Sequence, residues 1–171
     1  SKLAAALAKK LAQTGIREGD KVLYLGASHG YTPSFVSDIV GRKGFVFCLD
    51  SSARVVRDLI FVAEQRSNMT PILTDANQPK SYQHLVCAVD VLYQDIAQKN
   101  QVEIFLKNAD MYLKGGGFGL LAFKARSVDV TKNPKLLYKQ VMDELENHHL
   151  VVVDHRQLDP FEKDHTLFVV N

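Results

Sequence analysis

From residue 21 onward the sequence alternates between short β-branched or aromatic runs and longer segments with helical periodicity. This alternation is typical of a parallel sheet whose strands are joined by crossover helices. The predicted strands are 21–25, 45–50, 71–74, 89–95, 117–124, 150–156 and 166–170. The predicted helices are 3–14, 32–40, 53–65, 82–88, 101–113 and 134–148. The pattern therefore predicts an α/β fold with helices on both faces of a seven-stranded sheet.

The connection between the last two predicted strands, residues 156–165, is too short for a crossover helix. A short linker joins antiparallel strands, so the last strand is expected to run against an otherwise parallel sheet. The run from Lys114 to Gly117 predicts a sharp turn into the fifth strand. No repeat or Pro/Gly-rich linker divides the chain, which predicts a single domain over residues 1–171.

Charge is nearly balanced, with 21 Lys and Arg against 19 Asp and Glu, for a net charge of +2. An RNA partner would therefore need basic side chains gathered on one face, or a second protein to supply phosphate contacts. No apolar stretch reaches the ~20 residues of a membrane span, so an intracellular protein is expected. Cys48 and Cys87 lie in apolar runs without metal-ligand spacing and are predicted to be buried thiols.

A glycine loop follows the first predicted strand, where Gly26-Ala27-Ser28-His29-Gly30 leads into a helix. Small residues let backbone amides approach a ligand, and Asp50, at the end of the next strand, is placed to bind ribose hydroxyls. The three-glycine dinucleotide fingerprint is absent, which disfavours a nicotinamide dehydrogenase. Asp75, after the third strand, is interpreted either as an acceptor for an adenine amino group or as an ordinary turn residue.

Four side chains fall at element boundaries on one predicted rim of the sheet: Lys2, Asp95, Lys124 and His165. Such a group suits chemistry on a hydroxyl. In methyl transfer, for example, the protein must align the acceptor oxygen and help it lose its proton, and no metal is required. Repulsion between the two lysines would favour a neutral form of one, and Asp95 is expected to orient Lys124 and the ribose hydroxyl. Taken singly, each residue also fits a solvated helix start, a phosphate contact or a satisfied turn.

Six segments resemble the archaeal fibrillarin family in the same order along the chain. They are SKLAAA (1–6), LYLGAS (23–28), PILTDAN (71–77), DIAQ (95–98), KARSVDVTK (124–132) and PFEKDH (160–165). The resemblance implies a class I methyltransferase fold, S-adenosylmethionine as donor, S-adenosylhomocysteine as product, and a catalytic group at Lys2, Asp95, Lys124 and His165. It also implies that the donor pocket is lined by Gly26, Ala27, Thr32, Asp50, Asp75 and Ala76, with Asp95 and Gln98 near the methyl group.

The same resemblance implies methylation of a 2′-hydroxyl in rRNA or tRNA that a box C/D guide RNA selects. It implies three kinds of partner: a Nop-family scaffold protein, the guide RNA with its kink-turn-binding protein, and the target RNA. The location would be cytoplasmic in an archaeon and nucleolar in a eukaryote. The family also carries a small β-rich N-terminal domain, which the resemblance does not cover.

Two positions depart from the family pattern. Tyr31 stands in a loop where the family has Gly-Thr-Thr, and Asp50 is shorter than the usual glutamate. The alternatives are a noncatalytic assembly subunit of the same particle, or a methyltransferase with a protein or small-molecule acceptor. A metal-dependent catechol-type enzyme would need a carboxylate cluster, which the sequence lacks.

Overall fold

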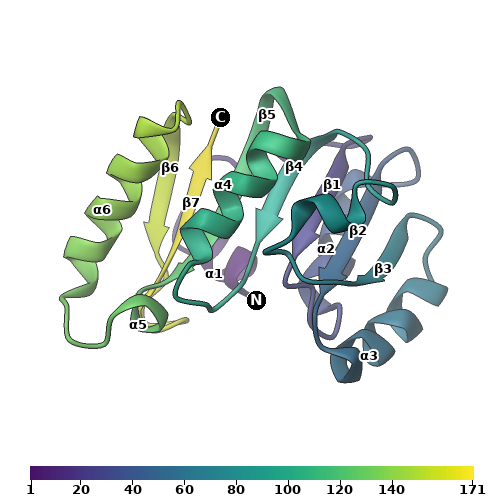
Figure 1. The fold of residues 1–171 in the computed structure, drawn as a ribbon, viewed down its shortest axis with the longest axis horizontal. Coiled ribbons are helices and arrows are strands. Elements are labelled where there is room, and N and C mark those ends of the chain that lie inside the picture. The colour runs from purple at the N-terminus through teal and green to yellow at the C-terminus, as the bar shows by residue number, and fades with distance from the viewer.

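One seven-stranded sheet organises the chain in the computed structural model, which describes residues 1–171 (Figure 1). The strand order is β3-β2-β1-β4-β5-β7-β6, and only β7 runs antiparallel to its neighbours. The strands are β1 (Lys21–Leu25), β2 (Phe45–Asp50), β3 (Met69–Leu73), β4 (Val89–Gln94), β5 (Leu113–Lys124), β6 (Val152–Gln157) and β7 (His165–Val170). The predicted fold class and the reversed last strand are confirmed.

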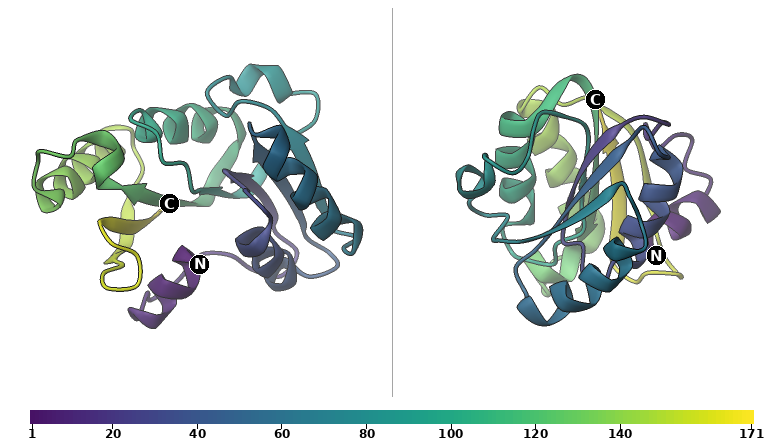
Figure 2. Two further views of the ribbon diagram at one scale, coloured as in Figure 1. Left: turned by 90° about the horizontal axis from the view of Figure 1, so that it is seen from below. Right: turned by 90° about the vertical axis from the view of Figure 1, so that its right-hand side faces the viewer.

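Helices cover both faces of the sheet (Figure 2). One face carries α1 (Lys2–Ala8), α2 (Tyr31–Val40) and α3 (Ala53–Glu64), and the other carries α4 (Gln101–Tyr112) and α6 (Pro134–Asn147). Short segments η1 (Pro79–Tyr82) and α5 (Ala125–Val128) complete the chain. None of the helices is both long enough and apolar enough to cross a membrane.

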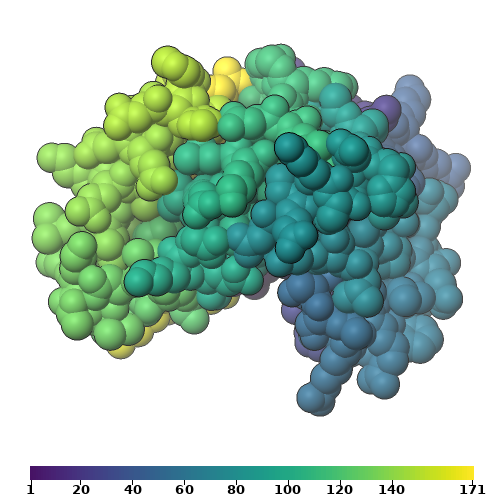
Figure 3. Space-filling view, viewed as in Figure 1, coloured from purple at the N-terminus to yellow at the C-terminus, as the bar shows by residue number.

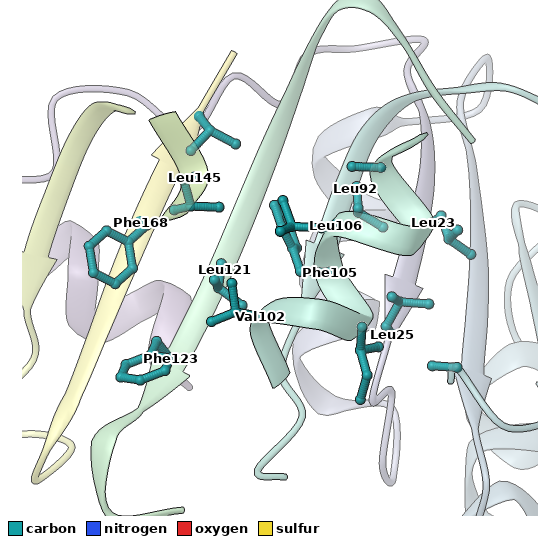
Figure 4. Close-up of a cluster of buried hydrophobic side chains, with 14 of the residues drawn as sticks. Leu23, Leu25, Leu92, Val102, Phe105, Leu106, Leu121, Phe123, Leu145 and Phe168 are labelled. Carbon is teal, nitrogen blue, oxygen red and sulfur yellow. The ribbon is translucent and has the colours of Figure 1, made fainter. Parts of the chain in front are cut away.

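Each face of the sheet has its own buried apolar cluster, of 24 and 22 residues. On the α4 face, Phe105 of α4 is fully buried between the sheet residues Leu92 and Leu121 (Figure 4). Burying one such side chain stabilises the fold by about 1.5–3 kcal/mol. Side chains alternate along each strand, so Leu121 faces α4 while Leu120 faces α1. This alternation decides where the polar residues at the strand ends point.

Several local predictions were wrong. The predicted helix 82–88 is replaced by the 3-10 turn η1, because Pro79 starts the turn and Tyr82 is anchored by a hydrogen bond to Asn108. The first helix ends at Ala8, well short of residue 14, since Lys10 adopts a left-handed φ of 61°. Strand β5 begins at Leu113, so residues 114–117 belong to the strand and do not form the predicted turn before it. Cys87, which was predicted to be buried, is exposed.

Candidate active site

The ends of β1, β2, β3 and β4 lie at one edge of the sheet because these strands are parallel, and ligands bind at this edge in such folds. A cavity of about 260 Å³ opens there. The outline of the molecule has a notch at this edge, between the blue part of the chain that contains α3 and the green part (Figure 3). Six of the predicted donor-binding residues line the cavity: Gly26, Asp50, Asp75, Ala76, Asp95 and Gln98.

A second cavity of about 400 Å³ adjoins the first and shares Gly26 and Asp95 with it. The other two predicted donor-binding residues, Ala27 and Thr32, line this second cavity together with Lys2. Its outer wall carries exposed aromatic rings, since Tyr31 is 76% exposed and Phe35 is 53% exposed. The two cavities thus meet at the ends of β1 and β4.

Gly26 is required where β1 and β4 end. Its φ is +80°, and a Cβ there would lie 2.2 Å from the carbonyl oxygen of Asp95. The Asp95 amide donates to the Leu25 carbonyl at 2.9 Å, which holds the two strand ends at this separation. Only glycine fits this backbone conformation and this space.

The carboxylate of Asp50 organises the glycine loop. One oxygen accepts from the Ser28 amide at 2.9 Å, and the other accepts from the Ser52 amide at 3.0 Å. Each carboxylate oxygen can accept a second hydrogen bond, so Asp50 keeps acceptor capacity toward the cavity. Asp75 likewise accepts from the Asn77 amide at 2.9 Å while it lines the same cavity. Its turn interpretation and its pocket position are therefore compatible.

The four predicted catalytic residues come from three strand ends and one helix start. The residues before Asp95 and Lys124 alternate so that Tyr93 and Ala122 face α1, which directs Asp95 and Lys124 to that same face. His165 is the register partner of Lys124 across the β5–β7 pair. Lys2, at the start of α1, reaches this edge from the face of the sheet that α1 covers.

Lys2 Nζ donates to Asp95 Oδ2 at 2.9 Å, and the two side chains are 20% and 23% exposed. The expectation that Asp95 would orient Lys124 was wrong, because its hydrogen-bonding partner is Lys2. The placement of α1 explains the difference: the Thr32 hydroxyl donates to the Ser1 hydroxyl at 3.1 Å and ties the helix start to the glycine loop. The Lys124 ammonium makes no hydrogen bond or ion pair within the chain.

The imidazole of His165 is buried, with 8% of the residue exposed. Its Nδ1 lies 2.7 Å from the carbonyl oxygen of Lys163. A carbonyl oxygen only accepts, so Nδ1 carries the proton of this bond. In the neutral ring Nε2 then holds the free lone pair, which makes it able to accept a proton from a ligand.

Two tyrosines that the sequence analysis missed lie beneath the Lys2–Asp95 pair. Tyr24 and Tyr93 stack with ring centroids 4.4 Å apart, and they lie two residues before Gly26 and two residues before Asp95, respectively. Burial raises the pKa of both phenols well above the usual range, and the Asp95 carboxylate adds to the shift. Both phenols are therefore neutral, and their buried surroundings strengthen the charge interactions of the neighbouring Asp95 carboxylate.

No group of three or more His, Cys, Asp or Glu side chains is arranged to hold a metal ion. The polar groups gathered at the two cavities are carboxylates, amides, hydroxyls, the Lys2 ammonium and the His29 imidazole. Such a set suits an adenosine and amino-acid ligand, because carboxylates accept from hydroxyl and amino groups.

A family model described as Fibrillarin matches residues 1–171. The chain is 49% identical over 169 residues to the fibrillarin-like rRNA/tRNA 2′-O-methyltransferase of Methanocaldococcus jannaschii, covering 99% of this chain and 73% of the relative. It is 47% identical to the protein of the same name from Pyrococcus horikoshii, covering 99% and 74%.

Solved structures agree with these sequence relatives. Fibrillarin of Methanococcus jannaschii superimposes with a TM-score of 0.96 at 49% identity, covering 99% of this chain and 74% of that one. Aeropyrum pernix fibrillarin, solved with natively bound S-adenosyl-L-methionine, gives 0.91 at 45% identity, covering 99% and 74%. A fibrillarin/Nop5p complex gives 0.92 at 39% identity, covering 99% and 80%.

Proposed function

The chain belongs to the fibrillarin family, and we propose that its residues 1–171 act as one methyltransferase domain on RNA ribose. It is an S-adenosylmethionine-dependent rRNA/tRNA 2′-O-methyltransferase, as the names of its relatives state for them. The observation that carries the proposal is the Lys2–Asp95 pair at the junction of the two cavities. A pair at that junction reaches both a donor and an acceptor.

The donor fits the cavity at the ends of β1 to β4. Asp50 would accept from the ribose hydroxyls and Asp75 from the adenine amino group, while Asp95 and Gln98 would border the methyl end. Ala76 would contact the adenine, and Gly26, Ala27 and Thr32 would hold the amino-acid end. When bound, the sulfonium of S-adenosylmethionine supplies an activated methyl group.

The amino-acid end of the donor would extend into the second cavity at Ala27 and Thr32. The acceptor nucleotide would occupy the outer part of that cavity, with its 2′-hydroxyl beside Asp95. Lys2, held by Asp95, would orient the hydroxyl, and alignment of this kind supplies much of a transfer rate. His165 Nε2, or Lys124 Nζ as the neutral amine, is the group we assign to take the proton, and both atoms are free of partners within the chain. Tyr31 and Phe35 would flank the acceptor base, since aromatic rings stack on exposed bases.

Partners would select the nucleotide. A relative that is 39% identical was solved in a complex with Nop5p, and a Nop-family scaffold suits a chain whose net charge is only +2. We assign the selection of the target nucleotide to a box C/D guide RNA with its kink-turn-binding protein, acting inside the cell. The alternative of a noncatalytic subunit is disfavoured by the Lys2–Asp95 pair.

Calorimetry with S-adenosylmethionine, S-adenosylhomocysteine and a nicotinamide dinucleotide tests the donor. Binding of the two adenosyl ligands alone is expected, and failure to bind them would leave the noncatalytic interpretation. A methylation assay with RNA, with and without the scaffold and a guide RNA, tests the acceptor. We expect turnover to depend on the guide; brisk methylation of naked RNA by the chain alone would contradict the proposed reliance on partners.

A further inference from the structure

The side chain of Gln101, in the first turn of α4, is fully buried and bonded to the main chain of Lys124. Its Oε1 accepts from the Lys124 amide at 2.9 Å, and its Nε2 donates to the Lys124 carbonyl at 3.0 Å. Both main-chain groups of one residue are thus satisfied by one side-chain amide. This is the pattern that a neighbouring strand would normally supply.

A neighbouring strand is missing at this point. The β4–β5 register ends at Gln94 opposite Leu121, whereas β5 continues to Lys124. On its other side Lys124 is opposite His165 of β7. Without Gln101 the end of β5 would have unpaired, part-buried main-chain groups toward α4, which is unfavourable. Gln101 therefore extends the sheet by the residue on which the lysine stands.

Gln101 also contacts the loop that borders the donor cavity. Its Nε2 donates to the Gln98 carbonyl at 3.0 Å, and its own carbonyl accepts from Gln94 Nε2 at 2.6 Å. The Gln98 side chain in turn accepts from Asn77 at 3.1 Å, beside the Asp75 turn. A continuous chain of hydrogen bonds thus runs from the rim of the donor cavity to the backbone of Lys124.

We propose that Gln101 is a positioning residue that fixes Lys124 relative to the donor-binding loop. The inference rests on the proposed function, because it gives Gln101 a role only through Lys124. Gln101 touches neither cavity, so it acts on the rate of transfer and leaves donor binding to the residues that line the pocket. Displacement of a reacting group by about 1 Å costs on the order of 100-fold in rate.

Two substitutions separate positioning from general stability. Gln101→Met keeps the length of the side chain and removes every side-chain hydrogen bond. Gln101→Glu keeps the acceptor toward the Lys124 amide, but it can donate to the Lys124 carbonyl only when it is protonated. We expect kcat in the assembled particle to fall roughly 10- to 100-fold in Gln101→Met, with S-adenosylmethionine Kd changed by less than ~3-fold. For Gln101→Glu, the kcat ratio to wild type should rise as pH falls, since burial favours the neutral acid.

Asn68 offers a matched control, because it is another buried amide bonded to main-chain carbonyls, those of Ser37 and Gly41, both at 2.9 Å. It precedes β3, at the edge of the sheet away from the site. Asn68→Ala should lower Tm while kcat stays near wild type. Lys124→Ala, measured alongside, should be inactive.

The outcomes distinguish the positioning role of Gln101 from the proposed function. A Gln101→Met protein with kcat within ~2-fold of wild type, beside an inactive Lys124→Ala, overturns the positioning role alone. A pH-independent Gln101→Glu ratio, or an equal kcat loss in Asn68→Ala, also overturns it. An active Lys124→Ala variant overturns both the catalytic assignment of Lys124 and the proposal that Gln101 acts through it. Absence of methylation by wild type, despite donor binding, contradicts the proposed function itself.

Discussion

Lys2 Nζ and Asp95 Oδ2 lie 2.9 Å apart although 93 positions separate the two residues in the chain. If the pair orients the acceptor hydroxyl, Lys2→Ala and Asp95→Asn should each lower kcat by about 100-fold, the scale of a positioned acid or base. Lys2→Ala should leave S-adenosylmethionine affinity near wild type. The double variant should lose little more than either single variant, because the two act as a unit. Additive losses would mean that they act separately; Lys10→Ala, on the exposed loop after α1, is the control.

Lys124→Ala should abolish turnover, because Lys124 is assigned to the proton transfer. It should spare donor binding, because Lys124 does not line the donor cavity. Single-turnover methylation and calorimetry on the same preparation would measure both effects. Lys124→Arg keeps the positive charge but holds its proton at working pH. An active arginine variant would exclude a proton-accepting role and leave an electrostatic one.

Asp50→Ala should have the reverse effect, weakening S-adenosylmethionine binding about 10- to 100-fold, the loss expected for charged hydrogen bonds of about 1.5–3 kcal/mol. The ribose contacts and the Ser28 amide bond would be lost together. Asp38→Ala, at an exposed position of α2, serves as the control, since Asp38 pairs with Arg66 and lines neither cavity. Unchanged donor affinity in Asp50→Ala would remove the ribose assignment.

Gly26→Ala should lose donor binding and more than ~1 kcal/mol of stability, because the new Cβ meets the Asp95 carbonyl and the backbone φ is positive. Gly115→Ala is the matched control, since a Cβ there meets nothing within 4 Å. Urea unfolding of both variants would measure the difference. Equal stability of the two would show that β1 and β4 separate easily at this point.

Asp90 provides a pH prediction at the opposite edge of the sheet. Burial raises its pKa, but hydrogen bonds from Lys114 Nζ and the Lys21 amide outweigh burial, so the pKa of Asp90 lies below its usual range. Because the pKa of Asp90 in the folded protein is lower than the unfolded value of about 3.9, the ionised carboxylate stabilises the fold at pH values above about 3.9. This stabilisation is lost as the pH falls through the pKa of the folded protein. Asp90→Asn should therefore unfold more easily at pH 7, with the difference shrinking toward pH 3. A constant difference across this range would exclude the linkage.

The architecture could be predicted because strand and helix periods are local properties. β1 and β2 begin and end at the predicted residues, since each is a β-branched or aromatic run bounded by turn residues. The η1 segment was missed because its shape depends on the contact of Tyr82 with Asn108 on α4, which no local pattern reports. The order of the parallel strands placed Asp95 and Lys124 at one edge of the sheet.

The partners of these groups could not be predicted in the same way. Which side chain Asp95 binds depends on where α1 packs, and the bond between Thr32 and Ser1 that places it is tertiary. Gln101 resembled an ordinary helix-start residue, because its partner Lys124 follows 23 positions later. Buried amides that complete a strand end have no periodic signature in a sequence.

Strand β7 is inserted between β5 and β6, so β6 has no neighbour in the sheet until the chain has passed residue 165. During synthesis, the residues up to the end of α6 can already assemble five parallel strands and the donor cavity, because every residue that lines this cavity comes before α6 in the chain. The step that brings His165 opposite Lys124 comes last, and long-range pairings of this kind form slowly. A nascent chain would therefore acquire its capacity to hold the methyl donor before its capacity to use it.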